Sequence, residues 1–129
     1  MVDRQLVPAA TRWEIVVGYS RAVRVGPWVF VAGTTAALDD GSAVGGDDIA
    51  EQTREALRRI MAALAQVGAG AEHVVRTRMS VTDIRRWEQV GRVHGEFFSA
   101  TRPATSMVEV HRLIAPELLV EIEVDAVIL

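Results

Sequence analysis

The stretch WVFVAGT, residues 28–34, has the length and the β-branched and aromatic side chains of a β-strand. Successive side chains of a strand point to opposite faces of a sheet. Both faces of this strand are apolar, since Val29 and Val31 alternate with Trp28, Phe30 and Ala32. A sheet that carries helices on one face normally shows polar residues on the other. This strand therefore predicts a sheet whose second face is buried as well.

The segments on either side predict further strands and a first helix. Residues 12–36, RWEIVVGYSRAVRVGPWVFVAGTTA, are expected to form two or three short strands separated at glycine and proline. Asp48 with Glu51 three residues later resembles a capping box and predicts the start of a helix that reaches about Val67. Gly68 is the expected stop signal of this helix.

The second half of the chain predicts three more strands and a second helix. Residues 73–83 alternate as a strand, and Asp83 is placed to cap a helix that ends near Ser99. Residues 101–113 and 117–129 are the last two expected strands. Four side chains of the second helix are expected to face the sheet: Trp87, Val90, Phe97 and Phe98.

Together these elements predict one domain over residues 1–129, of the α/β (α+β) class. The expected architecture is a mixed six-stranded sheet with two helices on one face. No helix remains for the second face, so another subunit is expected to cover it. We expect four residues in that contact: Val29, Val31, Val127 and Leu129.

The composition limits the possible chemistry. The 129 residues include no cysteine, and all 14 basic residues are arginine, so thiol catalysis and a lysine Schiff base are excluded. No His-x-x-x-His pair is present, and neither a metal nor a cofactor is expected. The net charge of −3 makes nucleic acid an unlikely partner. Because no apolar run approaches about 20 residues and the N-terminus does not resemble a signal peptide, a cytoplasmic protein without membrane contact is expected.

Three acids alternate along the last strand. Glu121, Glu123 and Asp125 point to one face and would repel one another without partners. Arg76 and Arg78, on the polar face of the strand 73–83, are the obvious partners. For Glu123 and Asp125 we favour a structural ion-pair network, whereas Glu121 is equally compatible with a structural role and with catalysis or ligand contact.

Five stretches in this order carry a resemblance to the Rid/YjgF family, also described as L-PSP endoribonuclease-like. They are GYSRAVRVGPWVFVAG (18–33), EQTREALRRIMAAL (51–64), VVRTRMSVTDI (74–84), RPATSMVEVHRL (102–113) and LVEIEVDAV (119–127). The resemblance implies a chorismate-mutase-like fold, a homotrimer, and small-molecule clefts between the subunits. The best-known members of this family hydrolyse enamines and imines.

The resemblance also implies where a substrate would bind. Tyr19 matches the tyrosine of the family's G-P-Y-S segment, and Gly33 matches the glycine of its S-G-Q turn, whose N–H helps to hold a substrate carboxylate. Thr34 flanks this glycine. Glu121 matches the acid that positions or activates the attacking water, and Met107 matches a pocket-wall position that is often cysteine.

The sequence departs from the family pattern P-A-R-S-x-V-E-V at Thr105, where the arginine that grips the carboxylate would stand. Hydrogen bonds of an arginine–carboxylate pair contribute about 1.5–3 kcal/mol, and a threonine hydroxyl does not replace that charge. Imino acids derived from ordinary amino acids are therefore expected to bind about ten to a hundred times more weakly. Thr105→Arg is expected to restore carboxylate binding if Gly33 and Glu121 are placed as in the family.

Three functions remain open from the sequence. The first is a Rid-like hydrolase of a small reactive imine, enamine or related metabolite, with Glu121 as general base. The second is a non-catalytic, trimeric metabolite-binding protein that uses the same cleft. The third is an endoribonuclease, which the net negative charge and the missing lysines disfavour.

Overall fold

A computed structural model describes residues 3–129; residues 1 and 2, which the single-domain prediction includes, lie outside the described part. Along the chain the elements are β1 (Arg4–Val7), α1 (Glu14–Val17), β2 (Ala22–Val25), β3 (Trp28–Thr34), α2 (Ile49–Gln66), η1 (Ala71–His73), β4 (Val74–Val81), η2 (Ile84–Arg86), α3 (Trp87–Phe98), β5 (Ala104–Glu109) and β6 (Val120–Val127). No helix in residues 3–129 is long and apolar enough to cross a membrane.

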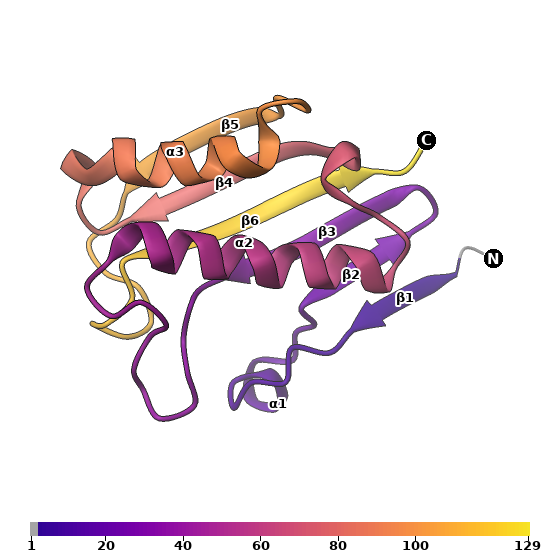
Figure 1. The fold of residues 1–129 in the computed structure, drawn as a ribbon. Coiled ribbons are helices and arrows are strands. Elements are labelled where there is room, and N and C mark those ends of the chain that lie inside the picture. Colours follow the sequence, from indigo (N-terminus) through magenta and orange to yellow (C-terminus); the bar gives the residue numbers. More distant parts are fainter. Residues whose placement is uncertain (1–2) are drawn as a thin grey trace.

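The six strands form one mixed sheet in the order β1-β2-β3-β6-β4-β5. The strands β4 and β5 are parallel, and the other neighbouring pairs are antiparallel. The long helices α2 and α3 lie side by side on one face of this sheet (Figure 1). The predicted α+β architecture, with two long helices on one face of a mixed six-stranded sheet, is therefore confirmed.

The helix α2 begins and ends where the sequence predicts. The Asp48 side chain accepts hydrogen bonds from the backbone N–H groups of Ala50 and Glu51, which otherwise have no partner in the first turn. At the other end Gly68 has a φ of 83°, a left-handed conformation that glycine adopts without steric cost. One side of α2 packs on the sheet with the buried side chains Ile49, Leu57, Ile60 and Leu64.

Of the two or three strands expected over residues 12–36, two form, β2 and β3, and the segment WEIVV before Gly18 does not form a third. Residues Glu14–Val17 form the short helix α1, which ends at Gly18 in the left-handed conformation with a φ of 77°. The β-branched side chains of this turn favour a strand, but they have no neighbouring strand to pair with and remain exposed. The sixth strand is instead β1 (Arg4–Val7), which pairs with β2 at the edge of the sheet.

The expected subunit contact of Val29 and Val31 was wrong. Both side chains are buried beneath the helices of their own chain. Trp28 and Phe30, which alternate with them, lie on the face without helices and are 52% and 49% exposed. We call this second side the open face of the sheet. Because Trp28 and Phe30 are half exposed there, the prediction that another subunit covers this face stays a prediction.

Two details of the second half differ from simple alternation. The strand β4 contains one residue more than β6 between the pairs Val74–Ala126 and Arg76–Asp125, so Val74 is buried and Val75 is exposed, against the predicted alternation. The second helix is preceded by the 3₁₀ turn η2, which Asp83 caps, and α3 itself begins at Trp87. Trp87 is 57% exposed and does not face the sheet as expected.

Candidate functional site

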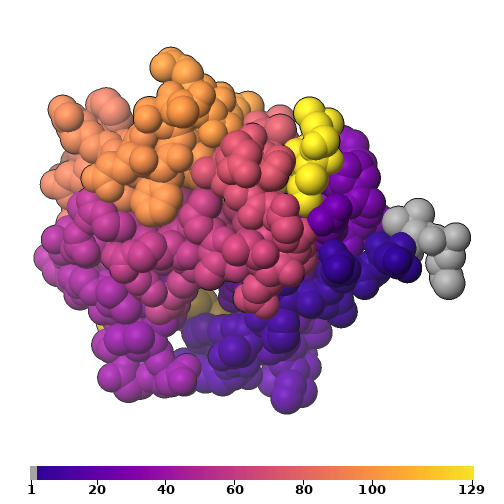
Figure 2. Space-filling view, turned by 45° about the vertical axis from the view of Figure 1, so that its right-hand side comes forward, coloured from indigo at the N-terminus to yellow at the C-terminus, as the bar shows by residue number. Residues whose placement is uncertain are grey.

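A cavity of about 320 Å³ lies next to the start of β6, and residues from widely separated parts of the chain line it. Figure 2 shows the surface hollowed between the N-terminal segment (indigo) and the loop after β3 (purple). The lining residues used below are Thr11, Arg12, Trp13, Val17, Tyr19, Arg21, Gly33, Thr34, Leu38, Asp39, Arg59, Ile114 and Glu121. The cavity therefore exists only in the folded chain.

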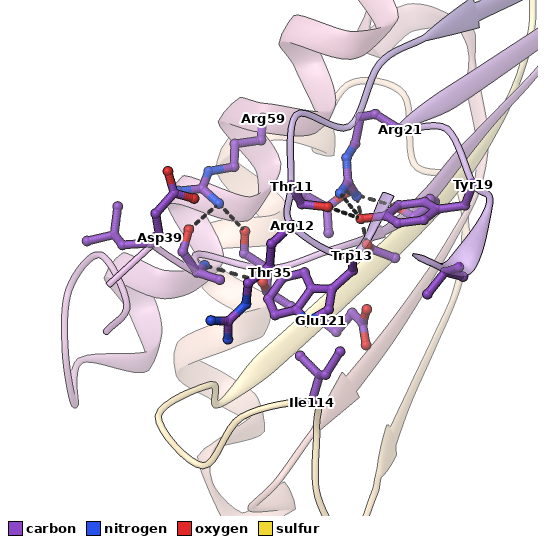
Figure 3. Close-up of a pocket in the computed structure, with 16 residues that line it drawn as sticks. Thr11, Arg12, Trp13, Tyr19, Arg21, Thr35, Asp39, Arg59, Ile114 and Glu121 are labelled. Atoms are coloured by element: carbon purple, nitrogen blue, oxygen red, sulfur yellow. Dashed lines mark hydrogen bonds between the residues drawn. The ribbon is translucent and has the colours of Figure 1, made fainter. Parts of the chain in front are cut away.

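Arg21 connects three of the segments that line this cavity. Its Nη1 donates to the Gly33 carbonyl oxygen at 2.8 Å and to Thr34 Oγ1 at 2.9 Å, and its Nη2 donates to the Tyr19 hydroxyl at 3.4 Å. The Tyr19 hydroxyl lies 2.7 Å from Thr11 Oγ1 (Figure 3). Sequence reasoning missed Arg21, although it follows the recognised tyrosine by two residues in one motif.

Gly33 reaches Glu121 because of an irregularity between β3 and β6. Val31 pairs with Val124 and Thr34 with Ile122, so β3 has one residue more than β6 between these pairs. Both Val31 and Thr34 are consequently buried on the helix side. A Cβ atom at Gly33 would lie only 2.4 Å from Glu121 Oε2, so the carboxyl group occupies the place of the missing side chain.

The Glu121 carboxyl group lies in a partly buried position against the cavity wall. Burial raises the pKa of Glu121 above its ordinary value, the negative charge of Glu123 raises it further, and the charge of Arg21 opposes both effects. Within residues 3–129 its carboxylate makes no hydrogen bond and no ion pair. An unpaired carboxyl group with a raised pKa is suited to taking up and releasing a proton.

The ion-pair network predicted on the open face is present around Arg78. Its Nη1 atom lies 3.2 Å from Glu123 Oε1 and 3.3 Å from Asp125 Oδ2, which confirms the partner for these two acids. Arg76, the other expected partner, forms no ion pair with the described residues. Because Glu121 stands outside this network, its carboxyl group is available for another role.

A second hollow of about 340 Å³ lies on the open face beside the first. Gly33 and Glu121 line both hollows, and Ser106 and Val108 of β5 line only the second. Glu121 therefore lies in the wall between the first cavity and a groove on the open face.

Tyr19, Gly33, Thr34 and Glu121 meet at the first cavity, whereas Thr105 and Met107 do not reach it within one chain. Thr105 pairs with Thr77, and Met107 pairs with Met79. Thr77 and Met79 are buried on the helix side, and Met107 packs against the same core. Any contribution of Thr105 and Met107 to a cleft thus stays a prediction that depends on a second subunit.

Thr105 continues a chain of hydrogen bonds that begins at α3. Its hydroxyl donates to the Pro103 carbonyl oxygen at 3.0 Å and lies 2.8 Å from Thr77 Oγ1, which lies 2.9 Å from His94 Nε2. Burial lowers the pKa of His94 below its ordinary value. His94 also contacts the ring of Phe98, so it is a packed residue of the helix.

Within residues 3–129, no group of three or more histidine and acidic side chains is placed to hold a metal ion. The cavity combines apolar walls, three arginines and two carboxyl groups, a pattern of apolar lining with a few polar groups that is common in small-molecule sites. The fold and this cavity define an α+β domain with helices on one face of its sheet and a partly buried acid on the other.

The sequence matches the family described as Endoribonuclease L-PSP over residues 10–128. The crystal structure of a Mycobacterium tuberculosis member of the YjgF/YER057c/UK114 family is similar, with 58% identity, a TM-score of 0.89, and coverage of 98% of this chain and 100% of that chain. An uncharacterized Streptomyces coelicolor protein is 40% identical over 120 residues, which are 93% of this chain and 89% of that protein. Reactive Intermediate Deaminase A, chloroplastic, of Arabidopsis thaliana is 25% identical over 95 residues, 74% of this chain and 51% of that protein. The chain belongs to the Endoribonuclease L-PSP family, the Rid/YjgF family of the sequence resemblance.

Proposed function

We propose that this protein is a Rid-like hydrolase that converts a small reactive imine or enamine into a carbonyl compound and ammonia. The observation that carries this proposal is the Glu121 carboxyl group, which is partly buried, unpaired and placed directly over Gly33. The name of the Arabidopsis relative, a reactive intermediate deaminase, supports the same reaction class.

The reaction requires proton transfers that one carboxyl group is able to perform. Water adds to the carbon of the C=N bond while Glu121 accepts a proton from the water. The nitrogen takes up this proton. The C–N bond of the resulting amino alcohol then breaks while its hydroxyl group gives a proton back through Glu121 to the leaving nitrogen and becomes the C=O group, so that ammonia and the carbonyl compound are the products. An enamine first takes up a proton at carbon from water and becomes the imine. A pKa above the ordinary glutamate value brings the carboxyl group closer to neutral pH, where it serves as both base and acid.

The proposal includes a homotrimer in which a neighbouring subunit covers the open face. Trp28 and Phe30 leave about half of their surface in water in the single chain, and exposed apolar patches of this kind commonly mark subunit contacts. In such an assembly Tyr19, Gly33 and Glu121 of one subunit lie in an inter-subunit cleft. Thr105 and Met107 of another subunit enter this cleft from the edge strand β5, because their side chains lie on the helix side and not on the open face.

The second candidate is a metabolite-binding trimer without catalysis, because Thr105 stands where the resemblance places a carboxylate-binding arginine. The third, an endoribonuclease, is disfavoured by the net charge of −3 and by the acids that occupy the open face. The first two candidates share the cavity and differ only in turnover.

The test is ammonia release from an imino acid that an amino-acid oxidase generates in the assay. Glu121→Gln keeps the shape of the side chain but accepts no proton, so it is expected to reduce the enzyme-dependent rate by a factor of about 100 or more. Glu123→Gln is the matched control, since it removes a carboxylate two residues away that pairs with Arg78 instead. Equal rates in the wild type and in Glu121→Gln would support the binding protein.

A further inference from the structure

Arg21 carries a positive charge in the cavity wall without a carboxylate partner. Its side chain is half-buried, and the three acceptors that it contacts, on Gly33, Thr34 and Tyr19, are all neutral. No carboxylate oxygen of residues 3–129 lies within 4.0 Å of its nitrogens. Partly desolvated charges normally have a counter-ion, because an uncompensated one costs free energy.

The hydrogen bonds of Arg21 leave two of its N–H donors free. A guanidinium group has five N–H donors, and three of them are used, which leaves two, on Nε and Nη2. Arg54 uses these same two nitrogens to hold the carboxylate of Glu96, at 3.2 Å and 2.9 Å. Arg21 is therefore held rigidly in place with the donors for a carboxylate unused.

Arg12 is a second arginine of the same cavity without a counter-ion. Its guanidinium lies 4.9 Å from the centre of the Trp13 ring, and among the described residues it makes no hydrogen bond and no ion pair. Arg59, the third arginine of the lining, is occupied by the Glu55 carboxylate and by two backbone carbonyl groups. The uncompensated positive charge of the lining is thus carried by Arg12 and Arg21.

The lining residues together indicate the charge, the polarity and the size of a ligand. Because Arg59 is neutralised by Glu55, the lining keeps Arg12 and Arg21 against Asp39 and Glu121, which balance when all four are ionised (2 − 2 = 0). Protonation of Glu121, whose pKa is raised by burial, leaves a charge of +1, which suits a singly charged anion better than a phosphate dianion. The side chains of Trp13, Val17, Leu38 and Ile114 supply apolar contacts. A cavity of about 320 Å³ is at the small end of the range for ligand sites.

We infer that Arg12 and Arg21 form an anion-binding site for the carboxylate of a small ligand with an apolar body. The chain thereby holds a carboxylate from the N-terminal side of the cavity, in place of the missing arginine at Thr105. The inference deepens the proposed function and rests on it for the site of the reaction, but anion binding itself requires no turnover.

The experiment compares benzoate with benzamide, which share an apolar ring and differ in charge, by calorimetric titration of the intact protein. We expect the wild type to bind benzoate at least about tenfold more tightly than benzamide, because of the charge-assisted bonds. Arg21→Lys keeps the charge but lacks the planar pair of N–H donors, and it should weaken benzoate binding by about tenfold or more. Arg12→Ala should weaken benzoate binding as well. Benzamide binding should change little in both variants.

Arg92→Ala is the matched control, because it removes a positive charge from α3, where Arg92 pairs with Glu88 outside the cavity. Equal affinity for the two probes, no benzoate binding by the wild type, or the same benzoate affinity in wild type, Arg12→Ala and Arg21→Lys would each overturn the inference. Arg12 is exposed at the rim, so Arg12→Ala decides the matter even if Arg21→Lys fails to fold.

The two proposals fail in different ways. Benzoate binding that depends on the two arginines, with no ammonia release from any imine, would retain the anion site and exclude the hydrolase. Imine hydrolysis that depends on Glu121 but is unchanged in Arg12→Ala and Arg21→Lys would retain the hydrolase and exclude the anion site.

Discussion

The two faces of the sheet are made from the same strands but differ in whether their side chains find packing and charge partners within one chain. In β6, Ile122 and Val124 are completely buried beneath the helices, whereas Glu121, Glu123 and Asp125 alternate with them on the open face and stay partly in water. The covered face finds all its contacts within one chain. The open face and its margin keep unpaired charges and exposed aromatic rings. These groups are available to bind a ligand or a second subunit.

The largest effect on the stability of the chain is expected on the covered face. Leu57→Ala removes a completely buried side chain from α2, and it should lower the free energy of unfolding by about 2–5 kcal/mol through lost burial and a cavity. The matched change is Leu6→Ala in the edge strand β1, where the side chain is exposed. Urea unfolding of both variants measures the difference, and similar losses would contradict the contrast between the faces.

On the open face the expected effect is on assembly. Phe30→Glu places a carboxylate opposite Asp125, its partner in β6, on the surface proposed to meet another subunit. Light scattering should show a trimer for the wild type and a monomer for the variant, while the helical circular dichroism remains. Trp87→Glu, a similar change at an exposed aromatic residue of α3, should stay trimeric. A monomeric wild type would contradict the homotrimer directly.

At the irregularity between β3 and β6, Gly33→Ala should displace the Glu121 side chain, because its Cβ would overlap Oε2. The expected result is a loss of about tenfold or more in ammonia release, since displacements of about 1 Å cost much of the rate. Gly91→Ala in α3 is the control, where the nearest atom to the new Cβ is 3.9 Å away. It should keep the rate and stabilise the helix by up to about 1 kcal/mol. Full activity of Gly33→Ala would remove Glu121 from the mechanism.

The smallest expected effect is on the pH dependence of stability. Since folding raises the pKa of Glu121, its ionised form is disfavoured in the fold, and this cost appears as the pH rises through the raised pKa. Glu121→Gln should therefore melt at a higher temperature than the wild type at pH 8, and at about the same temperature near pH 4. Thermal unfolding across this range measures the difference. A lower melting temperature of the variant at pH 8 would mean that a favourable partner stabilises the carboxylate.

Local chemistry in the sequence was sufficient for much of the fold. The capping by Asp48, the left-handed Gly68 and the alternation of β6 were all predicted, because each depends on residues close to one another in the chain. The same reasoning failed for WEIVV, since a β-branched segment forms a strand only where a neighbouring strand is available to pair with it.

The candidate site was recovered only in part for a similar reason. Tyr19, Gly33, Thr34 and Glu121 were recognised from motifs, but nothing local indicates that Arg12 and Arg21 share a cavity with Ile114 from a loop about a hundred residues away. Such a meeting depends on which strands become neighbours, and strand order is a property of the whole fold.

The extra residue in β3 shows most directly what tertiary structure decided. Strict alternation from Trp28 assigns Gly33 to the covered side with Val29 and Val31. The side-chain period of two follows from the sequence alone, but the bulge arises only when β3 pairs with β6, and every residue beyond it then changes face. That shift brings Gly33 to Glu121, because a strand's register is set by the partner against which it packs.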